Sequence, residues 1–281
     1  MKTLNSLSGG KTSSYIAVHY QADYNVFALV TTKDKSCLFP DKKLRQKVSD
    51  KLNKDFIGTL EDDVIIYTMF DLEQYIGKEI NWVSGNYFDD IIIKGDNRYL
   101  PNVTQRFCTT ELKLKPIYEW WKDNVKEVVK VRIGYRANET RRAKTMLKKV
   151  NGNGNLEMKD IVGKRKTQNK WANIEWQKPE FPLIKDNIYK DQIESFWQNK
   201  DVRFAYMNNC IGCFHRNPML LKLMSEKHPN KFEWFIKQEY DKGKKITFKN
   251  GVTYKSIKKT KLQYNLFESD FTECDSGYCG I

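Results

Sequence analysis

The sequence predicts an α/β fold, with a doubly wound, mostly parallel five-stranded sheet and helices on both of its faces, followed by a mainly helical, cysteine-bearing C-terminal extension. Two observations predict this fold. In the first part of the chain, short apolar segments typical of buried strands alternate with segments of helical periodicity. Beyond about residue 180, helical segments dominate. We therefore expect an α/β domain at residues 1–185 and an extension at residues 186–281.

The expected elements follow one another along the chain. The predicted strands are Leu4–Leu7, Val26–Thr31, Val64–Met69 and Val128–Ile133. The predicted helices of the α/β domain are Lys11–Gln21, Lys42–Asn53, Asp71–Ile80 and Lys115–Trp121. In the extension we expect helices at Ile188–Gln198 and Met219–Tyr240, the second interrupted at Pro229, and a hairpin turn at Asn250-Gly251.

The balance of charge favours a polyanionic partner. The 281 residues include 49 basic and 35 acidic side chains, a net charge of +14, and such an excess attracts nucleic acids and nucleotides. Ten basic and two acidic residues fall within 141–170, around the Asn-Gly repeats of 151–155. We interpret about 144–172 as a mobile basic insert, which points to tRNA or DNA as a partner. A solvated basic surface is the alternative.

The chain has no apolar run long enough to cross a bilayer, and its N-terminus enters a strand without a signal peptide. We therefore expect a cytoplasmic protein that does not enter a membrane. In that reducing compartment the six cysteines are not expected to form disulfides. Cysteines that the fold groups together then predict metal, cluster or catalytic roles.

The most informative motif is Ser8-Gly9-Gly10-Lys11-Thr12-Ser13, where a short strand breaks on two glycines and a helix begins. Such a turn presents unpaired backbone N–H groups and the positive end of the helix dipole, which together bind phosphate or sulfate. Lys11 adds a charge, and the three hydroxyl groups add donors. The motif is not a Walker A loop, because Asn5 stands where that loop requires glycine.

Cysteines form a second group of motifs. Cys210 and Cys213 make a C-x-x-C turn, and Cys108 lies far upstream. Three or four thiolates gathered by the fold favour an iron–sulfur cluster over structural zinc, because a second C-x-x-C is missing. A redox-active pair and inert buried cysteines are the alternatives.

Arginines follow the last predicted strand of the α/β domain, which ends at Gly134. Arg136 and Arg142 are candidate ligands for sulfate or phosphate, because guanidinium groups bind these anions through paired N–H donors. Pairing of either arginine with Glu139 in a solvated loop is the alternative.

Together these motifs resemble the phosphoadenosine-phosphosulfate (PAPS) reductase-like branch of the PP-loop (adenine nucleotide alpha-hydrolase-like) superfamily, and in particular its small bacterial and phage members. The resemblance covers roughly residues 1–240 and depends on several motifs occurring in the right order. These are Ser8–Ser13, Arg106–Thr109 with Leu112, Lys113 and Pro116, Gly134–Arg136 with Glu139 and Arg142, Phe181–Leu183, and Asn209–Cys213.

The resemblance implies that residues 1–185 bind an adenine nucleotide, either ATP or the sulfonucleotides PAPS and adenylyl sulfate (APS). The phosphates or the sulfate would lie on the N–H groups from Gly9 to Thr12, near Lys11. Three cationic side chains would point to the anionic end of the nucleotide: Lys113, Arg136 and Arg142. The resemblance is also compatible with Mg²⁺ as a further cofactor and with assembly as a homodimer.

The resemblance also implies a [4Fe–4S] cluster beside the nucleotide, held by cysteines like Cys108, Cys210 and Cys213. Relatives with a cluster carry a second cysteine next to the first, but residue 107 is Phe here. We therefore expect Cys279 as the fourth ligand. Cys274, Cys37 and an open iron site are the alternatives.

Three functions are consistent with the resemblance. The first is ATP-dependent sulfur transfer, in which an oxygen of tRNA or DNA is adenylated, pyrophosphate leaves, and sulfide held on the cluster displaces AMP. The second is sulfonucleotide reduction, in which Cys274 or Cys279 attacks the sulfate sulfur. The third is a non-catalytic nucleotide- or nucleic-acid-binding module. The net charge favours the first. The candidate catalytic residues are Lys11, Lys113, Cys274 and Cys279, of which the two cysteines are the candidate nucleophiles of the second function.

Overall fold

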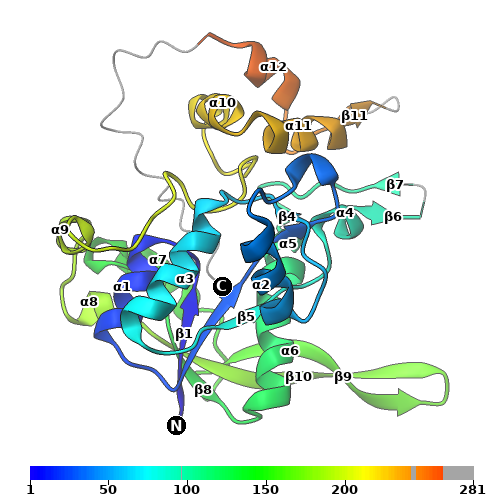
Figure 1. The fold of residues 1–281 in the computed structure, drawn as a ribbon. Helices are drawn as coiled ribbons and strands as arrows, with labels where there is room; N and C mark the ends of the chain where they lie inside the picture. The colour runs from blue at the N-terminus through cyan, green and yellow to red at the C-terminus, as the bar shows by residue number, and fades with distance from the viewer. Residues whose placement is uncertain (96, 242–244, 262–281) are drawn as a thin grey trace.

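Residues 3–180 build one six-stranded sheet in the computed structural model, which describes residues 1–95, 97–241 and 245–261 (Figure 1). The strand order is β5–β2–β1–β8–β10–β9, and every pairing is parallel except that of β9 with β10. The strands are β1 (Thr3–Leu7), β2 (Tyr24–Ala28), β5 (Asn81–Val83), β8 (Val129–Arg132), β9 (Leu156–Arg165) and β10 (Gln168–Glu180). The α/β class and the mostly parallel sheet are confirmed, but the sheet has six strands where the sequence predicts five.

Apolar side chains alternate along the strands and form a cluster on each face of the sheet, as the two-residue period of a strand requires. Leu7 and Phe27 lie in one cluster, which contains buried side chains of α1 (Lys11–His19) and α3 (Val64–Ile76). The other cluster contains Leu4 and Val26 with side chains of α6 (Lys115–Asn124) and α7 (Thr140–Leu147). Helices therefore pack on both faces.

The segment 64–76 forms the helix α3, so the strand predicted at Val64–Met69 is wrong. The segment resembles a buried strand because Ile65, Ile66 and Met69 lie within one short apolar run. The helical spacing continues through buried Leu72 to Gly77, whose positive φ of 59° ends the helix. Asp62 accepts the backbone N–H of Val64 at 3.0 Å and helps to start the helix. The helix predicted at Asp71–Ile80 is the second half of α3.

The basic segment that we expected to be a mobile insert contains regular secondary structure. It contains α7 and the long hairpin of β9 and β10, joined by a turn at the Asn-Gly repeats in which Asn151 accepts two backbone N–H groups. The sequence signal for these strands is weak, because lysines interrupt the alternation of apolar side chains on the exposed face. The strands form because the end of β10 pairs with β8 and continues the central sheet.

The C-terminal extension contains four helices among its described residues, and α8 (Pro182–Lys185) directly precedes it. The four are α9 (Lys190–Trp197), α10 (Pro218–Lys227), α11 (Pro229–Gln238) and α12 (Tyr254–Lys259). Figure 1 shows α10, α11 and α12 as a layer beyond the carboxyl ends of the parallel strands. A third apolar cluster joins this layer to Val30, Leu60 and Leu112 of the α/β part.

Local signals in the extension place most of its helices and turns correctly. Pro229 separates α10 from α11 as predicted, because proline is favoured in the first turn of a helix but disrupts its interior. Gly251 has a φ of 75° in the expected turn, and Lys249 bridges Val252. The chain beyond Val252 enters α12 rather than a long second strand.

Short elements connect these units. They are β3 (Thr31–Thr32), η1 (Lys35–Cys37), α2 (Lys42–Leu52), β4 (Gly58–Thr59), α4 (Phe88–Ile91), β6 (Ile93–Lys94), β7 (Asn97–Arg98), α5 (Phe107–Thr109), η2 (Thr110–Leu114), η3 (Ala137–Glu139), β11 (Tyr240–Asp241) and β12 (Lys245–Ile246). Within the described residues, none of the helices combines the length and apolar character that a membrane crossing requires.

Glu239 makes the stability of the extension depend on pH. Its carboxylate accepts the backbone N–H groups of Tyr254 at 2.7 Å and Phe248 at 3.3 Å, and burial raises its pKa to about 7. Because the folded state holds this proton more tightly than the unfolded chain, its contribution to stability is greatest below the usual carboxyl pKa and is lost as pH rises through about 7.

We therefore expect Glu239→Gln, which mimics the protonated form, to reduce the fall in unfolding temperature between pH 5 and pH 8 in thermal melts. Burial lowers the pKa of His215 to about 4, so its titration changes stability with the opposite sign. The quantity compared is therefore the difference in unfolding temperature between variant and wild type at each pH. Glu233→Gln, which removes an exposed partner of Lys258, serves as the control and should leave the pH profile unchanged. An identical profile for Glu239→Gln and wild type would contradict the assignment.

Candidate nucleotide and cysteine site

The glycine loop lies where the predicted motif places it, between the end of β1 and the start of α1. Gly9 has a φ of 76°, Gly10 is the N-cap, and no described side chain caps the helix there. The hydroxyl groups of Ser8 and Ser13 are 3.1 Å apart, and Ser13 also donates to the Gly10 carbonyl. The first N–H groups of a helix lack partners within the helix, so this loop has the geometry of an anion site.

Close packing around the loop explains its two glycines. A methyl group added at Gly9 would lie 2.5 Å from Ile65 Cγ2, and one added at Gly10 would lie 2.3 Å from Asn208 Nδ2. On a third side, a methyl group at Gly134 would lie 3.2 Å from Thr12 Cγ2. The loop therefore lies against α3, against the chain around residue 208, and against the segment that follows β8.

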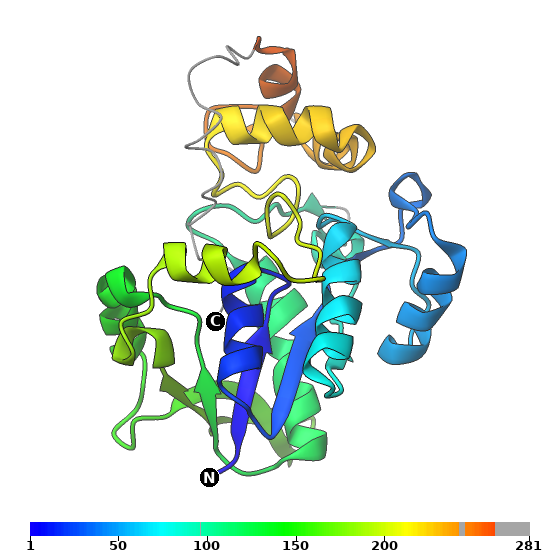
Figure 2. The same ribbon diagram turned by 60° about the vertical axis from the view of Figure 1, so that its left-hand side comes forward.

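Lys11 is paired with a carboxylate that the sequence analysis did not anticipate. Its ammonium group contacts Glu194 of α9, and its main-chain carbonyl accepts the indole N–H of Trp197 at 3.0 Å. Figure 2 shows α9 and the loop after it crossing the N-terminal end of α1. An anion at this loop would compete with Glu194 for Lys11.

The two candidate arginines lie on the segment after β8, the strand that neighbours β1. Arg136 donates through Nε to Glu139 at 3.0 Å, and Arg142 also pairs with Glu139. The guanidinium of Arg142 lies 4.2 Å from the ring centroid of Tyr135. The pairing with Glu139, which was the alternative expectation, is therefore present. Both arginines are held in place near the end of β8.

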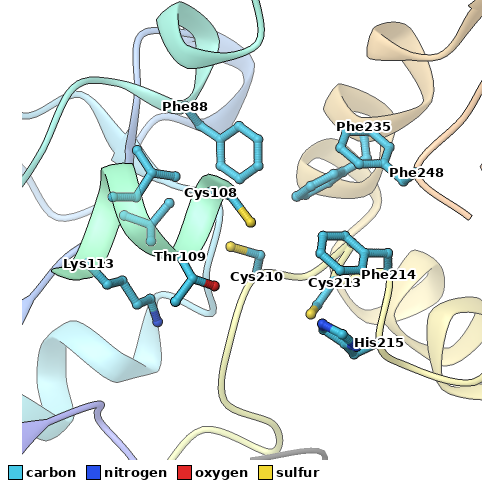
Figure 3. Close-up of a pocket in the computed structure, with 13 residues that line it drawn as sticks. Phe88, Cys108, Thr109, Lys113, Cys210, Cys213, Phe214, His215, Phe235 and Phe248 are labelled. Carbon is cyan, nitrogen blue, oxygen red and sulfur yellow. The ribbon is translucent and has the colours of Figure 1, made fainter. Parts of the chain in front are cut away.

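Three of the predicted cluster ligands line one pocket. Cys108 comes from α5, whereas Cys210 and Cys213 come from the loop before α10 (Figure 3). The sulfur atoms of Cys108 and Cys210 point toward one another, and Cys213 lies beside His215 (Figure 3). The pocket is partly open to solvent, and its remaining lining is mostly apolar.

Arg216 holds the loop that carries Cys210 and Cys213. Its buried guanidinium donates to the carbonyls of Asn208 at 2.6 Å, Asn209 at 3.3 Å and Cys210 at 3.2 Å. The N–H of Ile211 donates to the Leu60 carbonyl at 2.8 Å, which ties the same loop to the α/β part. The position of the two thiols therefore depends on a buried cation that is stabilised by main-chain dipoles.

A network of buried charges lies beside the pocket and was missed by the sequence analysis. Lys113, which lines the pocket, pairs with Glu61 at 2.9 Å, and the Glu61 side chain is 1% exposed. From α11, Lys231 donates to the Glu61 carbonyl and to Asp63, both at 2.7 Å. The run Glu61-Asp62-Asp63 before an apolar segment is the signal that could have revealed it, since acidic residues are enriched where helices begin.

His215 is neutral at physiological pH. Burial, followed by the charges of Arg106 and Lys249, lowers its pKa to about 4. A neutral imidazole next to Cys213 is suited to accept a hydrogen bond or to bind a metal. A single histidine carries little information in a sequence, so no role was predicted for His215.

The remaining ligand candidates are in different places. Cys274 and Cys279 lie outside the described residues. Cys37 is 2% exposed, is not part of the pocket lining, and burial raises its pKa to about 11. Within 1–95, 97–241 and 245–261, no group of three or more His, Cys, Asp and Glu side chains is arranged to hold a metal ion.

No protein-family model, no curated protein and no solved structure matches the chain.

A substitution at Gly212 tests how tightly the loop that carries Cys210 and Cys213 is packed. A methyl group at this position would lie 2.4 Å from Cγ of Phe235, a side chain only 1% exposed. We expect Gly212→Ala to destabilise the protein by about 1–3 kcal/mol in chemical denaturation and to increase the reaction rate of Cys210 and Cys213 with a thiol reagent.

Gly152→Ala is the matched control, because no atom lies within 4 Å of the added methyl group. It should change neither stability nor thiol reactivity. Wild-type behaviour of Gly212→Ala in both assays would show that the loop can move away from Phe235.

Proposed function

We propose that this protein is a PP-loop adenine-nucleotide enzyme of the PAPS reductase-like type, which transfers sulfur to a nucleic acid in an ATP-dependent reaction. One observation carries the proposal: residues 208–213 connect the glycine loop to the cysteine pocket. Asn208 packs on Gly10, and two and five residues later Cys210 and Cys213 line the same pocket as Cys108. The anion loop and the thiols are therefore neighbours, as the two halves of such a reaction require.

The strand order supports a nucleotide at the glycine loop. From β1 the sheet extends through β2 to β5 on one side and through β8 to β10 on the other. In doubly wound sheets of this kind, ligands bind beyond the carboxyl ends of the two strands where the direction reverses. The glycine loop follows β1 and the arginine segment follows β8, and Thr12 and Gly134 pack together at that place.

The three cysteines that line one pocket support a [4Fe–4S] cluster as the cofactor in this proposal. Each thiolate of such a cluster binds a different iron atom, so its ligands stand farther apart than those of a single ion. Cys108, Cys210 and Cys213 would hold the cluster, with the fourth position left to Cys279, to Cys274 or to an open iron. When bound, the cluster would supply an iron site for sulfide.

The protein's own residues bind and orient the reactants. The N–H groups of the first turn of α1 and the ammonium group of Lys11 would hold the phosphates of ATP, with or without Mg²⁺. An oxygen of the acceptor attacks the α-phosphorus, which forms an O–P bond and releases pyrophosphate. Sulfide then attacks the carbon that bears this oxygen, and the C–O bond breaks to release AMP. Lys113, fixed by Glu61, would stabilise the negative charge that develops.

Substitutions at the ion pair between Lys11 and Glu194 test the nucleotide site in opposite directions. Lys11→Ala should weaken ATP binding at least about tenfold, because it removes a charge-assisted contact to phosphate. Glu194→Gln should strengthen binding, because it removes the carboxylate that competes for Lys11. The measurement is titration calorimetry with ATP, PAPS and APS, and release of pyrophosphate from labelled ATP in the presence of tRNA or DNA and sulfide.

Lys42→Ala, on the exposed surface of α2, controls for the loss of one positive charge. Unchanged nucleotide binding in Lys11→Ala would exclude this loop as the phosphate site. The other possible outcome is that the protein releases sulfite from PAPS or APS with thioredoxin and releases no pyrophosphate from ATP. The proposed reaction would then be sulfonucleotide reduction and not sulfur transfer.

Anaerobic purification tests the cluster. We expect iron, acid-labile sulfide and a broad absorbance near about 400 nm, as thiolate-held clusters show. Cys108→Ala, Cys210→Ala and Cys213→Ala should each lose most of the iron, whereas Cys37→Ala, at a cysteine outside the pocket lining, should retain it. Equal iron in all four variants would remove the cluster from the proposal, and bound zinc would assign the thiols to a structural site.

A further inference from the structure

The hairpin of β9 and β10 exposes one of its faces to solvent. Trp171 pairs with Ile161 across the strands, and these side chains are 53% and 40% exposed. Because side chains alternate along a strand, Trp171 shares this face with residues 169 and 173, whose partners across the hairpin are Lys164 and Lys159. The opposite face turns toward α6, where Asp160 accepts from Tyr118 at 3.1 Å and from Lys122 at 2.6 Å.

A bulge enlarges the apolar part of the exposed face. The register shifts between Lys170 and Trp171, so that Val162 is an extra residue on β9, and its side chain is 47% exposed. We call Lys159, Ile161, Val162, Lys164 and Trp171 the arm face. It combines a large aromatic ring with aliphatic side chains beside it and a lysine at either end.

Positive charge surrounds the arm face. Residues 159–170 contain five basic side chains and one acidic side chain, Asp160. That acid is engaged on the other face by Lys122. The ammonium group of Lys159 lies 5.6 Å from the ring centroid of Trp171, so a positive charge and an aromatic surface lie side by side.

The arm also extends away from the rest of the molecule. β10 pairs with β8 only from Gln177 to Glu180, and its first nine residues continue past the start of β8 as one strand of the two-stranded hairpin (Figure 1). At the rise of a β-strand this length spans about 25–30 Å. The arm therefore lies toward the opposite end of the sheet from the glycine loop, where a mononucleotide bound at that loop does not reach it.

We propose that the arm face binds single-stranded nucleic acid, with a base stacked on Trp171 and the adjoining phosphates on Lys159 and Lys164. A ring flanked by lysines matches both the π-face of a base and its backbone charge. A base paired in a duplex presents no free face for such stacking. This inference deepens the proposed function, on which it rests for the reaction, and it makes the acceptor a polymer long enough to reach from the arm to the nucleotide site.

Oligonucleotide binding by the full-length chain tests the proposal. The probe is a fluorescein-labelled 20-mer of oligodeoxythymidine, measured by anisotropy without ATP at several salt concentrations. Trp171→Ala should weaken binding at least about fivefold, whereas Trp171→Phe should retain most of it. The double variant Lys159→Glu/Lys164→Glu should also weaken binding and reduce the salt dependence by about one to two released ions.

Lys42→Glu/Lys43→Glu on the exposed surface of α2 makes the same change in net charge and serves as the control, which should bind nearly as wild type does. Equal binding by folded Trp171→Ala and wild type would overturn the proposal, as would equal affinity for a duplex of the same length. A dimer that Trp171→Ala converts to monomer in sedimentation, without any binding of the probe, would assign the arm face to self-association instead. Calorimetry with ATP on the same samples separates the two proposals. If the wild-type protein binds the oligonucleotide but not ATP, only the proposed function is contradicted.

Discussion

The buried guanidinium of Arg216 organises the region in which the candidate site lies. It contacts three successive carbonyls, those of Asn208, Asn209 and Cys210, and thereby bends the loop so that one end meets the glycine loop and the other meets Cys108. Burial of a cation is unfavourable unless dipoles replace its hydration. Here main-chain carbonyls replace it, so the loop conformation and the buried charge stabilise each other.

The charges beside this loop link the extension to the sheet. Lys113 from η2 and Lys231 from α11 both bind the short acidic run before α3, one through the Glu61 side chain and the other through its main chain and Asp63. Burial raises the pKa of Asp63, and the charge of Lys231 opposes that effect. A buried ion pair loses much of its stabilisation when one partner is removed. The extension and the α/β part are therefore joined by charge as well as by apolar packing.

The parts of the structure that depend on local chemistry were predicted well. The glycine loop, the proline break before α11 and the turn at Gly251 each follow from the backbone preferences of glycine or proline. The segment Val64–Met69 was assigned wrongly, because a short apolar run fits a buried strand and a buried helix equally well. The β9–β10 hairpin was missed because its exposed face is rich in lysine, and its pairing with β8 is a tertiary contact.

For the site, the sequence placed Cys108 with Cys210 and Cys213, although about a hundred residues separate them. The pairing of Glu139 with the arginines was an alternative prediction, because these residues are close in sequence. The sequence could not reveal that Glu194 pairs with Lys11, since that partner is set by how α9 packs on α1. Isolated acidic residues are common on any surface, so nothing in the chain distinguishes Glu194 from the rest.

The attachment of Lys231 has a consequence for how the molecule comes apart. Separation of the extension from the sheet would break the ion pair between Lys231 and Asp63. It would also expose the apolar side chains that surround Leu60 and Leu112. We therefore expect both parts to unfold together as one cooperative unit. A fragment that ends at residue 185 would expose an apolar surface where the extension had packed.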